Sequence, residues 1–354
     1  MKHVVKSICV LLLWLTASAL AAPPAPATRP VRTKAEVDKL IDEAGKTPPE
    51  WWNSVTVNTP PTVDLTWKSV PGWQPQKNLG SYLWDIIYPN PSRWREGVKL
   101  MHQTLAVNKD NKDALNKSMR TLAANYSELL QDFPRAAYWG KKAGDEELLL
   151  AECYWKLGCK QAAVDLLEEL TADFTRNGQA IKLWADMGEL KTALEWADAM
   201  ADLSSPSPAY LAAGDACRLN GKIPEAIKFY EKVLALPDGK GDSKRNKDRA
   251  KASLEAIKLF DTLDLAKVPD GTYKSNSIGY VGPIEVAVTV KNKRIEKVEV
   301  TNHKEKQFYA SLTEIPQRIV AKQSVKGIDM TTGATITSEA IVNATAKALA
   351  GAQK

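Results

Sequence analysis

A glycine followed five residues later by an alanine occurs three times in the middle of the chain, and this spacing constrains the fold strongly. Apolar residues at helical spacing precede each glycine and follow each alanine. Glycine allows a tight turn between two helices, and alanine allows the helices to pack closely. The glycines are 30 and 33 residues apart, so the pattern predicts an array of helical hairpins. The pairs are Gly158 with Ala163, Gly188 with Ala193, and Gly221 with Ala226.

This spacing resembles that of tetratricopeptide repeats, whose period is about 34 residues. The helical pattern extends over residues 92–263, with Asp132 and Ala137 as a degenerate upstream copy and 92–107 as a flanking helix. A last helix is expected at 252–263, after a polar and basic segment at 237–251 that is either a solvated loop or the start of this helix. Stacked helix pairs form a solenoid with a concave face. Two roles remain open for it: docking a specific partner, or acting as a spacer or self-association scaffold.

The N-terminus has the features of a secretory signal peptide. A positively charged start at residues 2–6 precedes an apolar run at 8–15, and small residues at 19–22 complete a cleavage pattern. The run is too short to span a bilayer, and no later segment approaches about 18 apolar residues. We therefore expect cleavage after residues 1–21 and an exported chain, periplasmic or otherwise extracytoplasmic, without a transmembrane segment. The alternative is a retained N-terminal anchor.

The segment 22–91 is rich in proline and tryptophan. Within it, residues 34–46 are predicted to form a short helix with Val37, Leu40 and Ile41 on one face. The prolines beyond this helix forbid long helices, so we expect an irregular arm whose tryptophans pack on the helical repeats. The alternative is an aromatic platform that binds sugars.

The composition of the chain excludes several kinds of partner and site. The chain has 354 residues with a net charge of +6, which is too diffuse to indicate a nucleic-acid partner. Only 3 histidines and 4 cysteines are present, so we expect no metal site. Cys153, Cys159 and Cys217 follow the leader without C-x-x-C spacing, which argues against a redox pair. We expect them to be small buried side chains, with or without one disulfide.

The pattern changes at the C-terminus, where residues 268–354 are predicted to form a separate domain. Apolar and polar residues alternate over 284–290 and again over 295–300, which indicates a β-hairpin. Helices are predicted over 308–322 and 338–350. A hairpin with packed helices is an α+β fold. The predicted fold class of the whole chain is therefore mixed, an α-helical tetratricopeptide-like solenoid followed by a small α+β domain.

The loop between these two predicted helices, residues 327–338, reads GIDMTTGATITS. It resembles the flavinylation motif of the FMN-binding domain family: Asp, two variable residues, Ser or Thr, Gly, Ala, then Ser or Thr. The opening Asp270-Gly271-Thr272-Tyr273, the glycine turn at 279–283, the hairpin and His303-Lys304-Glu305 match the family in the same order. The site residues are Asp329, Thr332, Gly333, Ala334, Thr335, Thr337 and Ser338.

The resemblance implies that Thr335 carries FMN through a phosphoester bond, installed from FAD by a dedicated flavin transferase. It implies a recognition or hydrogen-bonding role for Asp329. Residue chemistry agrees, because the threonine hydroxyl can take a phosphoryl group and the small residues before it leave the backbone open. Thr337 or Ser338 is predicted to cap the last helix, with Glu339 in its first turn, so that a phosphate on Thr335 lies just outside the helix N-terminus.

The family contains flavin-carrying subunits of sodium-pumping and Rnf-type electron-transfer complexes. We therefore expect an exported, membrane-associated flavoprotein that relays electrons to or from a redox or envelope partner docked by the repeats. No catalytic residue is assigned, and an electron carrier is favoured over a complete oxidoreductase. The alternatives are a non-enzymatic envelope scaffold without flavin, and a flavoenzyme that reduces a small molecule. Phe308 and Tyr309 are expected to stack on the ring or to lie in the core.

Overall fold

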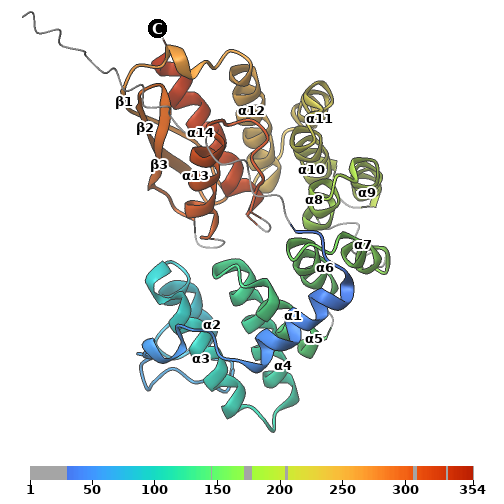
Figure 1. The fold of residues 1–354 in the computed structure, drawn as a ribbon, viewed down its shortest axis with the longest axis vertical. Coiled ribbons are helices and arrows are strands. Elements are labelled where there is room, and N and C mark those ends of the chain that lie inside the picture. The colour runs from blue at the N-terminus through green and yellow to red at the C-terminus, as the bar shows by residue number, and fades with distance from the viewer. Residues whose placement is uncertain are drawn as a thin grey trace, which may run out of the picture.

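The computed structural model describes residues 30–144, 146–170, 178–203, 206–305, 309–331 and 334–353. Among the described residues, helices joined by irregular segments run as far as α12, and a three-stranded sheet with two helices follows (Figure 1). The predicted mixed architecture is confirmed. The helices of the first part are α1 (Lys34–Lys46), α2 (Leu79–Tyr82), α3 (Trp94–Val107), α4 (Lys112–Ala124), α5 (Phe133–Ala143), α6 (Glu147–Lys156), α7 (Lys160–Glu168), α8 (Gly178–Asp186), α9 (Leu190–Leu203), α10 (Pro206–Leu219), α11 (Ile223–Ala235) and α12 (Asp242–Phe260).

The turns of three helical hairpins contain the glycines of the repeated pattern. Gly158, Gly188 and Gly221 join α6 to α7, α8 to α9 and α10 to α11, with φ angles of 98°, 81° and 71°. In each turn the residue after the glycine donates its backbone N–H to a carbonyl five residues earlier, as Glu189 does to Trp184 at 3.0 Å. The alanine five residues after each glycine is fully buried. The glycines therefore supply a left-handed backbone conformation at each turn.

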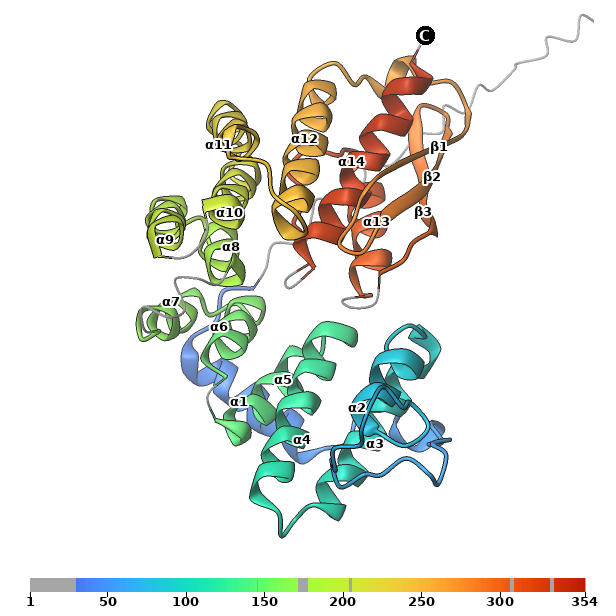
Figure 2. The same ribbon diagram turned by 180° about the vertical axis from the view of Figure 1, so that it is seen from behind.

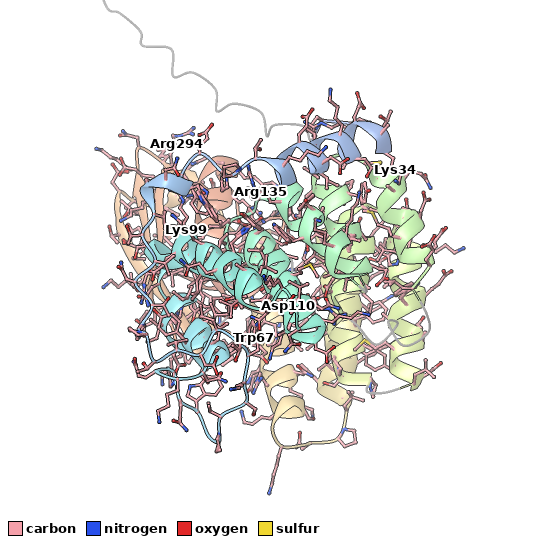
Figure 3. All side chains as sticks on the ribbon, turned by 90° about the horizontal axis from the view of Figure 1, so that it is seen from below. Lys34, Trp67, Lys99, Asp110, Arg135 and Arg294 are labelled. Atoms are coloured by element: carbon pink, nitrogen blue, oxygen red, sulfur yellow. The ribbon has the colours of Figure 1, made fainter. Side chains whose placement is uncertain are left out.

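The N-terminal arm is irregular between α1 and α2 and is fastened to α3 and α4. Lys99 of α3 donates to the carbonyl of Trp52 at 2.9 Å, and Trp67 Nε1 donates to Ser118 Oγ of α4 at 2.7 Å. Figure 3 labels Trp67 and Lys99 on this side of the molecule. Trp73 departs from the expected burial, since 62% of it is exposed. Helix α1 covers the predicted residues.

Helix α12 begins ten residues before residue 252, because the basic segment is the start of this helix, one of the two alternatives that its sequence left open. Lys244 and Asp248 form an ion pair of 2.6 Å across one turn of this helix, which stabilises a segment that looks merely solvated in the sequence. Arg249 in the same segment is buried against α14. The charge pattern of the segment does not predict this burial, because the acidic partner of Arg249, Glu339, lies 90 residues further along the chain.

The C-terminal part contains β1 (Gly271–Ile278), β2 (Pro283–Lys291) and β3 (Arg294–Asn302), paired antiparallel in that order. Helix α14 (Thr335–Ala352) packs on β1 and β2, and α13 (Ser311–Lys322) packs on β3, so the alternating apolar residues of β2 are buried. Asn292 and Lys293 both have positive φ angles in the two-residue turn between β2 and β3. The sheet therefore has one covered face, as its alternation predicts.

The helical part curves around the C-terminal part (Figure 2). Helix α12 packs against both α11 and α14, so it joins the two parts. A second contact lies near the start of the arc, where buried Trp94 and Leu129 pack against Tyr309. Tyr309 thus has the core role, and Phe308 lies outside the described residues.

The three cysteines of the helical part, Cys153, Cys159 and Cys217, are buried free thiols, so the disulfide alternative is not realised. Within the described ranges, no helix is both long and apolar enough to cross a bilayer.

Candidate functional site

The motif loop leads into the N-terminus of α14, which begins at Thr335. Ala334 is the N-cap residue and makes no side-chain capping bond. The predicted cap at Thr337 or Ser338 is therefore wrong, because both residues lie inside the first turn of the helix. Thr335 itself is partly exposed at the first helical position. Thr332 and Gly333 of the motif lie outside the described residues.

Thr337 and Ser338 connect the helix to other segments instead. Thr337 Oγ1 donates to Glu305 Oε2 at 2.6 Å, and Ser338 Oγ accepts from the backbone N–H of Thr331 at 3.2 Å. The other oxygen of the buried Glu305 carboxylate accepts from the backbone N–H of Val281 at 3.0 Å. Glu305 therefore ties the glycine-rich turn between β1 and β2 to the start of α14, a role that its place in the sequence does not reveal.

A cavity of about 510 Å³ lies between the start of α14 and the helical part, a volume within the range of small-molecule sites. Thr335, Ile336 and Glu339 of α14 line it on one side. Residues of α8, α10 and α12 line it on the other. The threonine singled out by the motif thus opens on a cavity that two distant parts of the chain enclose.

Four ionisable side chains lie together in the wall of this cavity: Arg218, Arg249 and Glu339 are buried, and the side chain of Asp215 is 14% exposed. Arg218 Nη2 and Arg249 Nη2 each lie 3.3 Å from a carboxylate oxygen of Glu339, and Arg249 Nη2 lies 3.5 Å from Asp215. Tyr230 donates to the Asp215 carboxylate at 2.8 Å. Glu339 was expected to be a first-turn residue of a helix; in the structure it is the counter-ion of two arginines from α10 and α12.

Burial, followed by the nearby charge of Glu339, raises the pKa of Asp215 well above its ordinary value. Burial opposes ionisation of Glu339 as well, but the charges of Arg218 and Arg249 outweigh it and lower the pKa of Glu339. The surroundings therefore favour the protonated form of Asp215 and the ionised form of Glu339.

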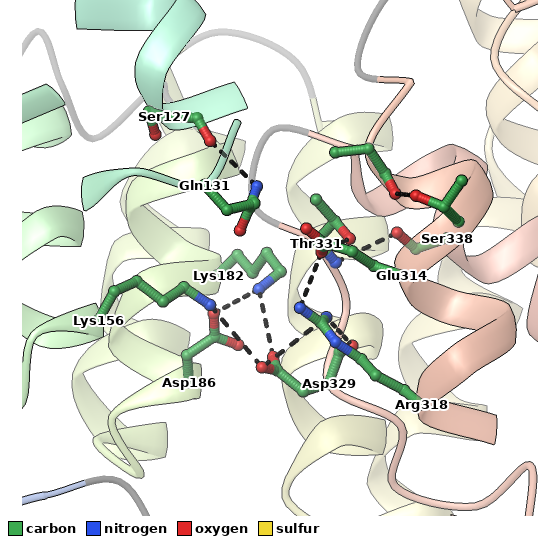
Figure 4. Close-up of polar contacts among 12 residues, drawn as sticks. Ser127, Gln131, Lys156, Lys182, Asp186, Glu314, Arg318, Asp329, Thr331 and Ser338 are labelled. Atoms are coloured by element: carbon green, nitrogen blue, oxygen red, sulfur yellow. Dashed lines mark hydrogen bonds and ion pairs between the residues drawn. The ribbon is translucent and has the colours of Figure 1, made fainter. Parts of the chain in front are cut away.

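Asp329 of the motif faces the helical part (Figure 4). Its carboxylate lies 3.7 Å from Lys156 Nζ of α6, 4.0 Å from Lys182 Nζ of α8 and 3.9 Å from Arg318 Nη1 of α13. Arg318 also donates to the backbone carbonyl of Asp329 at 2.6 Å. Lys182, itself buried, is paired with Asp186 as well. Asp329 thus forms an ionic contact between the motif loop and two helices of the first part.

Residues 279–350 match the FMN-binding domain family. The C-terminal part of this chain is an FMN-binding domain. An uncharacterized protein of Treponema pallidum (strain Nichols) is 37% identical over 86 residues, which are 24% of this chain and 24% of that protein. The chain thus matches about a quarter of the length of this relative. No solved structure gives a significant match to the chain.

The residues around the cavity fit FMN. Thr335 offers a hydroxyl beside a helix N-terminus without a side-chain cap, where backbone N–H groups and the helix dipole favour a phosphate. Arg218 Nη2 and Arg249 Nε are buried and make no hydrogen bond with any other described residue. Such donors suit an anionic ligand. Among the described residues, no group of three or more His, Cys, Asp or Glu side chains is placed to hold a metal ion.

Proposed function

We propose that this chain is an exported flavoprotein that carries FMN on Thr335 and relays electrons to or from a protein docked by its helical part. The observation that carries the proposal is the position of Thr335. It is the first residue of α14 in an FMN-binding domain, and its side chain lines the cavity.

The attachment is a transfer of a phosphoryl group from FAD. The Thr335 hydroxyl oxygen forms a bond to the phosphorus of the FMN half, the bond between the two phosphates breaks, AMP leaves, and the hydroxyl proton is released. A flavin transferase performs this step. Once bound, the flavin supplies one- and two-electron chemistry, while the protein holds it in position and sets the charge around it.

The role of the helical part in this proposal is to dock the electron donor or acceptor, because curved helical arrays present extended binding surfaces. Export is proposed from the leader, and covalent attachment suits a compartment in which a lost cofactor is not easily replaced. We favour an electron carrier over a complete oxidoreductase, because the flavinylation motif specifies a place for a cofactor and none for a second substrate.

The test is co-expression with a flavin transferase, followed by intact-mass measurement. Wild type should gain the mass of one FMN phosphoester, mapped to the peptide that contains Thr335. Thr335→Val has a similar shape but no hydroxyl and should lose the flavin, whereas Thr335→Ser should keep it. The matched control Thr313→Val, in α13 away from the cavity, should remain flavinylated.

An unmodified wild type beside an active transferase would contradict the proposal, as would flavin retained by Thr335→Val. A measurable midpoint potential then separates the electron carrier from a scaffold that holds no flavin.

A further inference from the structure

Most of the residues that line the cavity beside Thr335 belong to the helical part of the chain. Among them are Ala212 and Ala216 of α10 and Lys182 of α8, together with Arg218 and Arg249. The family match does not extend to any of these residues, since it begins at residue 279. A flavin attached to Thr335 and lying in this cavity would therefore contact residues outside the FMN-binding domain.

The two arginines are the notable polar groups of this wall. Their side chains are only 7% and 9% exposed, so their N–H groups have little access to water. Nη2 of Arg218 lies 3.3 Å from Glu339 without hydrogen-bond geometry, and Nε of Arg249 finds no hydrogen-bond partner among the described residues. Buried donors of this kind are costly unless a ligand satisfies them.

The cluster contains two arginines and two carboxyl groups. Arg218 and Arg249 contribute two positive charges, and Glu339 contributes one negative charge. Burial and the charge of Glu339 raise the pKa of Asp215, which favours its uncharged form. The two arginines then outnumber the one carboxylate beside them, which suits the single negative charge of a phosphodiester on Thr335. Two-electron reduction of a flavin with uptake of one proton from solvent leaves one further negative charge on the ring.

We propose that Arg218 and Arg249 of the helical part bind the FMN held on Thr335 and stabilise its reduced, negatively charged form. The flavin site is then shared between the two parts of the chain, and the helical part sets the redox potential. This inference rests on the proposed function.

The main test measures the midpoint potential of the flavinylated full-length chain by reductive titration against a reference dye. Arg218→Gln and Arg249→Gln each remove a positive charge and should lower the potential. A tenfold loss in stabilisation of the reduced over the oxidised flavin corresponds to about 30 mV. Arg218→Lys retains the charge and should stay near wild type. Arg294→Gln, in β3 away from the cavity, is the matched control and should not shift.

A second measurement needs no variant. Wild type produced with and without the transferase is compared by amide hydrogen exchange. Exchange in α10 and α12 should slow in the flavinylated chain, because the flavin would fill the cavity against them.

Intact mass separates the two possible failures. If wild type carries no FMN after co-expression with an active transferase, the proposed function itself is wrong. If FMN is present on Thr335 but the midpoint potentials of both Gln variants equal that of wild type, the shared site is wrong and the proposed function stands. The same conclusion follows if hydrogen exchange in α10 is unchanged by flavinylation. A shift in Arg218→Lys as large as that in Arg218→Gln would also overturn the shared site, because disruption of packing would then explain both.

Discussion

His102, a residue of α3, is surrounded by aromatic rings from other segments of the chain. Its ring lies 4.9 Å from that of Trp52 and 5.2 Å from that of Trp139, both edge-on, and its Nε2 is 3.4 Å from the hydroxyl of Tyr126. Burial among these groups lowers the pKa of His102 to about 4 from its ordinary value of 6.5. Packing of the arm through Trp52 thus helps to keep His102 uncharged in the folded chain.

This coupling predicts a loss of stability in acid. Between pH 6.5 and 4 the unfolded chain binds a proton at this position and the folded chain does not, so the free energy of unfolding falls as the pH is lowered. The full contribution is at most about 3 kcal/mol. Urea unfolding at pH 7 and pH 4.5 should show a smaller loss for His102→Gln and His102→Phe than for wild type. Equal losses in all three proteins would contradict the assignment.

Glu339 shows how packing assigns the role of a residue. Near the N-terminus of an isolated helix it would simply interact with the helix dipole. In the folded chain, Arg218 and Arg249 surround it from two other helices, and its pKa is lowered by their charges despite its burial. Removal of any one member of this cluster leaves another buried charge without its partner, so single changes have effects beyond their own contacts.

At the scale of elements, two glycines allow the effect of backbone strain to be measured apart from the effect of steric contact. Gly188 has a φ of +81°, and a Cβ added to it would meet no atom within 4 Å. Gly351, in the last turn of α14, also has open space around it but no left-handed backbone. The two glycines therefore differ in conformation alone.

Gly188→Ala should cost about 1 kcal/mol, because an L-residue is strained in the left-handed conformation. Gly351→Ala should be neutral or stabilising by up to about 1 kcal/mol, because alanine favours the helix. Chemical denaturation of the two variants measures the difference. Equal effects would show that the turn between α8 and α9 does not require its positive φ.

At the scale of the whole molecule, the C-terminal domain touches the curved helical part at separate places. One is the buried cluster around Glu339, and another is the contact of Tyr309 with Trp94 and Leu129. Asp329 adds an ionic contact with Lys156 and Lys182. Because these contacts lie at separate places along the interface, we expect the two parts of the chain to unfold together.

Tyr309→Ala should therefore lower the free energy of unfolding of the whole chain by about 3 kcal/mol, as expected for truncation of a buried aromatic side chain. Tyr280, which is 43% exposed in the same domain, is the matched control, and Tyr280→Ala should cost less than about 1 kcal/mol. Calorimetry measures both. A loss confined to one of two separate transitions would show that the parts unfold independently.

The sequence predicted β2, β3 and most of the helices, because the periodicity of apolar residues reports which face of an element is buried. The β2 alternation is an example, and the turn glycines are another. It left the start of α12 open and misplaced the start of α14. Both starts depend on partners distant in the chain: Arg249 is buried by Glu339, and Thr337 is bonded to Glu305 instead of capping its own helix. Local propensity contains no information about such contacts.

The sequence by itself determined the helical array, the α+β domain and the identity of Thr335 as the motif threonine, since each of these depends on residues near one another along the chain. Only the tertiary structure decided that Thr335 opens on a cavity walled by α8, α10 and α12, and that two arginines of the helical part lie in that wall. The physical reason is that burial and pairing of charge depend on distances in space between segments that no local pattern connects.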